Sequence, residues 1–159
     1  RAMEWIEVDL ENATWSIPGH RMKMLSDHIV PLSTQAVALL KDLHLVTGDR
    51  QLAFPSLKGE GRPLSENTIN AALTAMGYDG TRHRAHGFRA SARTMLDEQL
   101  GYPAHLIEHQ LAHAVKDANG RAYNRTSHLA DRKEMMQCWA DYLDKLTAGA
   151  TVLTLRAAA

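Results

Sequence analysis

The spacing of apolar residues changes once along this chain, at Ser33, and this change limits what the chain can fold into. Before Ser33, apolar and charged residues alternate, a period of two that is typical of strands with one buried face. After it, apolar residues recur every three or four positions, which is typical of helices that pack on a core. The sequence therefore predicts an α+β fold that is mainly α, with a small three-stranded antiparallel sheet at its N-terminal end.

The predicted elements are bounded by residues that start or end helices and strands. The strands are expected at Trp5–Asp9, Thr14–Ile17 and His28–Leu32. The helices are expected from Ser33 to Gly48, from Ser65 to Gly77, from Gly87 to Gln99, after Pro103, around Tyr123 and from Leu129 to Leu146. Ser33 and Ser65 are the expected N-caps, because a serine hydroxyl can accept a hydrogen bond from a free N–H group of the first turn. Phe54 is expected to anchor the loop between these two helices to the core.

The length of 159 residues and the hydrophobic content of 45% are enough for one core and indicate one domain. We place this domain at residues 1–147 and a tail at residues 148–159. Within the tail, Thr151–Leu155 is expected to form a strand that docks on the chain's own sheet or on a neighbouring subunit.

Cys138 is the only cysteine, so no internal disulfide is possible and a reducing cytoplasm is the expected location. No apolar run is long enough to cross a bilayer, so no membrane partner is expected.

The formal net charge is zero, so overall charge does not indicate a nucleic-acid partner. The charge is unevenly distributed, because the start of the chain is acidic and the segment 82–93 is basic. Such a basic segment can contact backbone phosphate, although the same residues could form an ordinary solvated face. The candidates for these phosphate contacts are Arg82 and Arg84, together with Arg21 on the second turn of the expected sheet.

Three short motifs contain the residue types that could attack a phosphodiester without a metal. They are His86-Gly87-Phe88-Arg89, Leu111-Ala112-His113 and Ala122-Tyr123-Asn124-Arg125. A tyrosine phenolate can form a covalent phosphoester, and cationic donors can hold the non-bridging oxygens as negative charge builds. His86 and Arg89 are three residues apart, so both can face one site at the start of a helix. Each residue alone is more often structural, and it is their joint occurrence that favours the chemistry.

These motifs resemble those of the catalytic domain of tyrosine recombinases, specifically the integrases of temperate phages and genomic islands. The resemblance covers nearly the whole chain and includes further pieces at Trp5–Leu10, Arg21–Met24, His28–Ser33 and Ile107–His113. It implies the DNA breaking-and-rejoining catalytic fold, with site-specific recombination or integration of double-stranded DNA at attachment sites through a 3′-phosphotyrosine. It also implies a tetramer on DNA, no cofactor, no metal and a bacterial host.

The resemblance further implies a role for each matched residue. Tyr123 would be the nucleophile that takes the scissile phosphate. Arg89 would bridge the non-bridging oxygens and His113 would donate a hydrogen bond to the phosphate. His86 would assist proton movement at the tyrosine. Lys23, on the turn between the second and third strands, would be the general acid for the leaving 5′-oxygen.

The chain departs from the family pattern at its start. The family's first catalytic arginine, with an acidic residue close behind it, precedes the first strand, and Arg1 does not align with it. The chain also begins without Met. We therefore expect it to be the C-terminal part of an integrase and to be deficient in cleavage as it stands.

Two other functions stay open from the residues alone. A non-enzymatic DNA-binding or assembly module, such as a degenerate integrase, would bind duplex DNA in a salt-dependent way without needing Tyr123. A metal-dependent hydrolase could use His105, His109 and His113, which recur every fourth residue on one helical face. No carboxylate stands at the spacing that zinc hydrolases use, so we expect no metal. His105 and His109 are then expected to line a surface or a groove.

Overall fold

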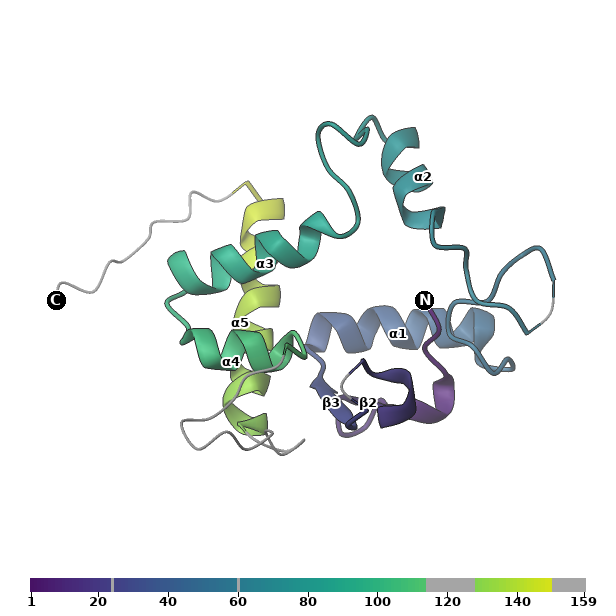
Figure 1. The fold of residues 1–159 in the computed structure, drawn as a ribbon, viewed down its shortest axis with the longest axis horizontal. Helices are drawn as coiled ribbons and strands as arrows, with labels where there is room; N and C mark the ends of the chain where they lie inside the picture. The colour runs from purple at the N-terminus through teal and green to yellow at the C-terminus, as the bar shows by residue number, and fades with distance from the viewer. Residues whose placement is uncertain (24, 60, 114–127, 150–159) are drawn as a thin grey trace, which may run out of the picture.

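The computed structural model describes residues 1–23, 25–59, 61–113 and 128–149 (Figure 1). Its strands are β1 (Val8–Asp9), β2 (Thr14–Ile17) and β3 (His28–Pro31), and its 3-10 helices are η1 (Trp5–Glu7) and η2 (Gly19–Arg21). Its α-helices are α1 (Thr34–Thr47), α2 (Thr68–Ala75), α3 (Gly87–Glu98), α4 (Ala104–Gln110) and α5 (Leu129–Thr147). The fold is α+β and mainly helical, which confirms the predicted class. The helix predicted around Tyr123 and the strand predicted at Thr151–Leu155 lie outside the described residues.

The sheet is antiparallel with the strand order β1–β2–β3, as predicted. Trp15 in the central strand pairs with Val8 on one side and with Val30 on the other. The connection between β2 and β3 contains η2 and carries Arg21 and Lys23. The prediction that these two cations lie on the second turn of the sheet is therefore confirmed.

The first strand is shorter than predicted, because Trp5–Glu7 forms a turn of 3-10 helix. The contacts of Trp5 explain this difference. Its backbone N–H donates to the Gln51 carbonyl at 3.0 Å, and its indole N–H donates to the Thr47 carbonyl at 2.9 Å. The ring is therefore held at the C-terminal end of α1, and the alternating sequence pattern becomes a strand only from Val8 onward.

The two predicted serine caps differ in outcome. The Ser33 hydroxyl accepts a hydrogen bond from the backbone N–H of Ala36 at 3.2 Å, which confirms it as the N-cap of α1. The prediction for Ser65 is wrong, because α2 begins three residues later at Thr68. The Ser65 hydroxyl lies 2.8 Å from the Thr68 hydroxyl, and the Ser65 carbonyl accepts the Thr68 N–H at 3.1 Å. Ser65 thus closes a separate turn before the helix.

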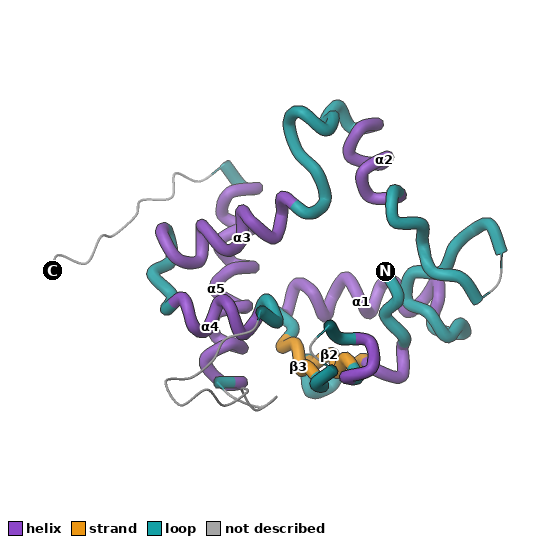
Figure 2. Tube along the Cα trace, in the orientation of Figure 1, coloured by secondary structure: helices purple, strands orange, loops and turns teal. Residues whose placement is uncertain are grey.

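Two clusters of buried apolar residues hold the fold together. One lies between the sheet, α1 and the N-terminal segment; it is formed by Met3, Leu40 and Ala53, and Phe54 packs against it as predicted. The other lies among α3, α4 and α5 and is formed by Leu96, Leu106, Ile107 and Met135. Figure 2 shows α5 crossing behind α3 and α4, and α5 also contacts α1 and β3. Helix α5 therefore joins the two halves of the molecule.

The inward face of α5 follows a spacing of three or four residues. It is formed by Arg132, Met135, Trp139 and Tyr142. Leu143 and Leu146 are 40% and 42% exposed, because Tyr142 continues the buried stripe in their place. Although α5 is the longest helix described, no helix in the described parts of the chain has both the length and the apolar character needed to cross a membrane.

Candidate active site

The His-x-x-Arg motif lies at the start of α3. His86 is the residue before the helix and Arg89 is on its first turn, and both side chains are exposed. The Arg89 guanidinium donates through Nη2 to the Leu111 carbonyl, just past the end of α4. This bond places Arg89 beside the turn that carries His113, whose side chain is 48% exposed. The structure thus brings Arg89 and His113 together, with His86 on the adjoining end of α3.

The position of His113 is set by how α4 ends. The backbone N–H of His113 donates to the Glu108 carbonyl, and that of Ala112 donates to the His109 carbonyl, both at 3.0 Å. These two bonds, with Ala112 at a φ of 52°, form a Schellman motif at the helix C-terminus. The left-handed conformation at Ala112 reverses the chain direction. It therefore brings His113 back over the last turn of α4.

A carboxylate that the sequence analysis did not assign to the site lies under His113. Glu108 binds His113 Nδ1 through one carboxylate oxygen, and its other oxygen accepts from Arg93 Nε on α3 at 2.6 Å. The hydrogen bond from His113 lowers the pKa of Glu108 below its ordinary value, and the bond and charge of Arg93 act in the same direction. Glu108 is therefore an anion held between the Arg93 guanidinium and the His113 imidazole. Its spacing of five residues from His113 does not match one helix face, so the sequence alone gave no signal for the contact.

The two candidates on the β2–β3 connection have different surroundings. Arg21 is engaged within the fold, because its guanidinium pairs with Glu7 and donates to the Ala2 carbonyl. Lys23 is exposed. Within the described parts of the chain, no hydrogen bond or ion pair joins Lys23 to α3 or α4.

Arg82 and Arg84 lie in the loop between α2 and α3 and are both exposed. The guanidinium of Arg84 donates through Nε to the Gly80 carbonyl at 3.3 Å. Arg84 and His83 line a small polar pocket of about 260 Å³ against α2. The Asn70 side chain, which also lines this pocket, accepts the Ala85 N–H at 2.9 Å and so holds the loop to α2. The two arginines are therefore presented to solvent from an anchored loop.

Tyr123, the predicted nucleophile, lies outside the described residues. The described chain stops at His113 and resumes at His128, just before α5. Both of these flanking points lie at α4 or α5. The described part of the site therefore contains Arg89, His86, His113 and Glu108 but not the predicted nucleophile.

A buried polar junction lies where α4, α5 and β3 meet. Arg132 is fully buried; its Nε donates to the Gln110 side chain at 2.9 Å and its Nη2 to the Ile29 carbonyl at 2.5 Å. Burial lowers the pKa of Arg132 to about 10. His28 is also buried, with Nε2 3.3 Å from the Gln110 carbonyl. Burial, together with the charges of Arg132 and Arg89, lowers the pKa of His28, so this imidazole is held neutral.

The three histidines of α4 and its end do not share one site. His109 is buried and its ring lies 6.1 Å from that of His28, so the expectation that it lines a surface or groove is wrong. His105 is exposed and stacks edge-on against His128. His113 pairs with Glu108. Over the part of the chain that the structure describes, no group of three or more His, Cys, Asp or Glu side chains could hold a metal ion.

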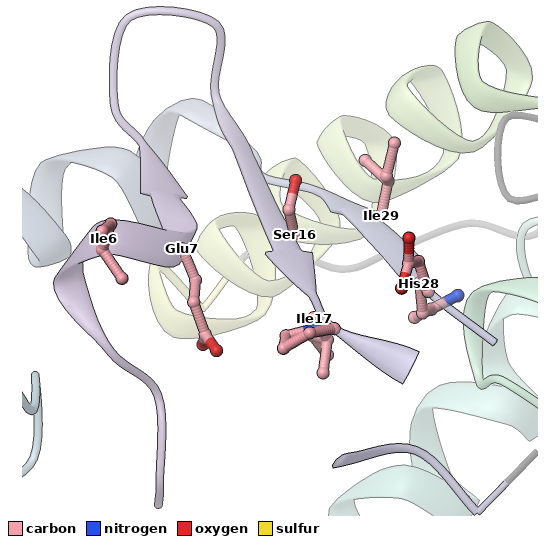
Figure 3. Close-up of a pocket in the computed structure, with 8 residues that line it drawn as sticks. Ile6, Glu7, Ser16, Ile17, His28 and Ile29 are labelled. Carbon is pink, nitrogen blue, oxygen red and sulfur yellow. The ribbon is translucent and has the colours of Figure 1, made fainter. Parts of the chain in front are cut away.

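A larger pocket of about 330 Å³ lies beside the ends of β2 and β3 (Figure 3). Glu7 from η1, Ile17 from β2 and His28 from β3 are among the residues that line it. None of the candidate catalytic or phosphate-binding residues is part of its lining. We therefore place the candidate site at α3 and the end of α4, not in this pocket.

The chain matches the model of the Phage integrase family over residues 1–129. It belongs to this family. The matched residues of this integrase chain include every candidate named above, from Arg21 to Tyr123. No solved structure matches the chain significantly.

Individual relatives of this integrase chain agree with the family match. Prophage integrase IntA of Escherichia coli (strain K12) is 43% identical over 150 residues, which cover 94% of this chain and 36% of that protein. The integrase of Enterobacteria phage P4 is 44% identical over 158 residues, covering 91% of this chain and 36% of the relative. The integrase of Shigella phage Sf6 is 37% identical over 146 residues, with 91% and 37% covered. The chain thus spans little more than a third of the length of these relatives.

Proposed function

We propose that this chain supplies catalytic residues for the cleavage and rejoining of double-stranded DNA at attachment sites through a covalent 3′-phosphotyrosine, as in a tyrosine recombinase, and that the chain by itself is deficient in cleavage. The observation that supports this most strongly is the pairing of Arg89 with the turn of His113 through the Leu111 carbonyl. It places the Arg89 guanidinium at the turn that carries His113, and both side chains are exposed, which suits a phosphate group. Membership of the phage integrase family supports DNA as the substrate.

In this proposal Tyr123 attacks the scissile phosphorus. A bond forms between the phenol oxygen and phosphorus, and the bond from phosphorus to the 5′-oxygen breaks. The leaving 5′-oxygen takes a proton from Lys23, and the phenol proton passes towards His86. Rejoining is the reverse: a 5′-hydroxyl displaces the tyrosine from the 3′-phosphate. The phenol needs nearby cations because its reference pKa of about 10 leaves it protonated at neutral pH.

Arg89 and His113 stabilise the negative charge on the non-bridging oxygens in this step. A guanidinium has five N–H donors, so the bond of Arg89 to the Leu111 carbonyl leaves donors for phosphate. Each donor lost from a developing oxyanion costs roughly 3–4 kcal/mol, or about two to three decades in rate. Because Leu111 fixes the guanidinium, this stabilisation requires little rearrangement when DNA binds.

Contacts with the DNA backbone come from the loop before α3 in this proposal. Arg82 and Arg84 are exposed on that loop, so they can bind phosphates and position the duplex without reading its sequence. Arg21 contributes less, because Glu7 already neutralises it. Strand exchange between two duplexes requires several protomers, and we propose a tetramer on DNA, with the tail at 148–159 docking in cis or on a neighbour.

The test is covalent trapping on a nicked suicide duplex that carries the attachment site, in buffer with a chelator. We use the longest natural polypeptide that contains this chain. An adduct is expected with the unmodified protein and with Tyr78→Phe, a matched control at a half-exposed tyrosine. Tyr123→Phe is expected to form none, because a ring without its hydroxyl cannot attack phosphorus.

Two outcomes would contradict parts of this proposal. An adduct that persists in Tyr123→Phe would remove the nucleophile assignment. Duplex binding that weakens with salt but yields no adduct from the unmodified protein would support a non-enzymatic DNA-binding module instead.

A further inference from the structure

Glu108 and His113 contact each other twice, and both contacts follow from the end of α4. The His113 backbone N–H donates to the Glu108 carbonyl at 3.0 Å, and the His113 ring meets the Glu108 carboxylate through Nδ1. In a Schellman motif the side chains at these two positions commonly make an apolar contact. Here the same position holds a carboxylate and an imidazole. The backbone turn that ends α4 therefore brings the Glu108 carboxylate and the His113 imidazole into contact.

The contact determines which nitrogen of His113 carries a proton. An ionised carboxylate only accepts hydrogen bonds, so Nδ1 must be the donor. Nε2 makes no hydrogen bond within the described parts of the chain, and the side chain is 48% exposed. The ring is thus anchored on one side and open on the other. If Nε2 also carries a proton, the ring is an imidazolium, and the adjacent carboxylate compensates its charge.

Arg93 fixes the carboxylate itself. Its Nε donates to the second oxygen of Glu108 at 2.6 Å, so both oxygens have a cationic partner. Arg93 lies on α3, one turn after Arg89. Arg89 binds the Leu111 carbonyl, which belongs to the turn that ends α4 and carries His113. Two arginines of one helix thus hold the backbone and the carboxylate that together place His113.

We propose that Glu108 is a positioning residue that holds His113 with its proton on Nδ1 and its Nε2 directed to the scissile phosphate. The proposal rests on the proposed function, in which His113, as an imidazolium with protons on both nitrogens, donates through Nε2 to that phosphate. A carboxylate that orients an imidazole through Nδ1 is a general means of fixing tautomer and ring orientation. The alternative is an ordinary exposed ion pair, which adds little to stability and has no effect on the chemistry.

The first test reads the tautomer and needs no activity. ¹⁵N-labelled histidine spectra of the chain are recorded at about pH 8.5, some two units above the reference pKa of imidazole. His113 is expected to carry its proton on Nδ1 in the unmodified chain and to lose this preference in Glu108→Leu. Glu98→Leu is the matched control, because Glu98 is an exposed acid on α3. A proton on Nε2 in the unmodified chain would overturn the proposal, even if Glu108→Leu failed to fold.

The second test separates chemistry from binding on the suicide duplex. Glu108→Leu is expected to lower the rate of adduct formation by about 10- to 100-fold, the range seen when a group that orients a functional histidine is removed. The duplex Kd is expected to stay within about twofold, because Glu108 itself makes no phosphate contact. An unchanged rate in Glu108→Leu, with an adduct in the unmodified protein, would refute the role of Glu108. An Nδ1 proton without any adduct from the unmodified protein would instead refute the proposed function.

Discussion

Helix α4 carries a polar junction on each of its two sides, and the two are built differently. On the buried side, Arg132 is held by the amide of Gln110 and the carbonyl of Ile29, and no carboxylate partner is present in the described parts of the chain. On the exposed side, the Glu108 carboxylate is held between the Arg93 guanidinium and the His113 imidazole. One junction uses neutral acceptors around a buried charge, and the other uses opposite charges in contact with water.

The difference shows what each junction can do. A buried cation with neutral partners has fixed geometry but no access to a ligand, so it can only join elements of the fold. An exposed pair gains little stability, yet it keeps one face of His113 open to solvent. The buried side of α4 therefore joins elements of the fold, and its exposed side orients His113, a group that can contact DNA. The predictions below test this division.

The largest effect is expected from Arg132→Met. Removing the guanidinium leaves the half-buried Gln110 amide oxygen and Ile29 carbonyl without this donor, at a cost of up to about 1–3 kcal/mol each. Urea unfolding is expected to show a loss of about 2–4 kcal/mol, whereas Arg50→Met, at an exposed arginine, should change stability by less than about 0.5 kcal/mol. A loss below about 1 kcal/mol for Arg132→Met would show that the junction does not hold the scaffold.

A smaller effect is expected from pH, through His28. Its neighbours are the buried His109 and the cations Arg132 and Arg89. Because burial and these charges lower its pKa in the folded chain, the unfolded chain binds a proton more readily. The neutral His28 therefore contributes fully to the stability of the fold above the ordinary pKa of 6.5. As the pH falls below 6.5, this contribution is lost progressively, and the loss ends once the pH is below the lower pKa that His28 has in the folded chain.

Urea unfolding from about pH 8 to pH 5 of the unmodified chain and of His28→Gln checks this, since the range spans the reference pKa of imidazole. The comparison removes the contributions of the other histidines. The unmodified chain should lose more stability on acidification than the variant. Parallel curves for the two proteins would mean that His28 does not titrate differently in the folded state.

The smallest effect is expected from Ala112→Gly on the exposed side. Ala112 has a φ of 52°, a conformation that costs a residue with a Cβ about 1–2 kcal/mol. Glycine removes this cost but adds entropy to the unfolded chain, so a net gain of about 0.5–1 kcal/mol is expected. Ala90→Gly inside α3 should instead lose about 1 kcal/mol. Thermal unfolding of both variants measures whether each substitution raises or lowers stability. A loss of stability in both variants would show that the left-handed conformation of Ala112 carries no strain.

The sequence predicted well what depends on neighbours along the chain. The cap of α1 at Ser33 requires only a bond to Ala36, three residues on. The position of Glu108 under His113 was not predictable, because the turn between them has alanine where glycine would mark a left-handed residue. The partners of Arg132 lie 22 and 103 residues away, so no local pattern reveals them. Local rules thus found the elements and most of the candidate cations, whereas the contacts that orient them needed the fold.

We expect the protein to form a covalent bond to DNA at one residue. The most direct measurement is mass-spectrometric mapping of the peptide that carries the trapped DNA, with the linked end of the DNA identified. The account predicts a single peptide modified at Tyr123, joined to a 3′-phosphate and formed equally well in a chelator. A bond at another residue, a 5′-phosphate linkage or a requirement for metal would contradict it.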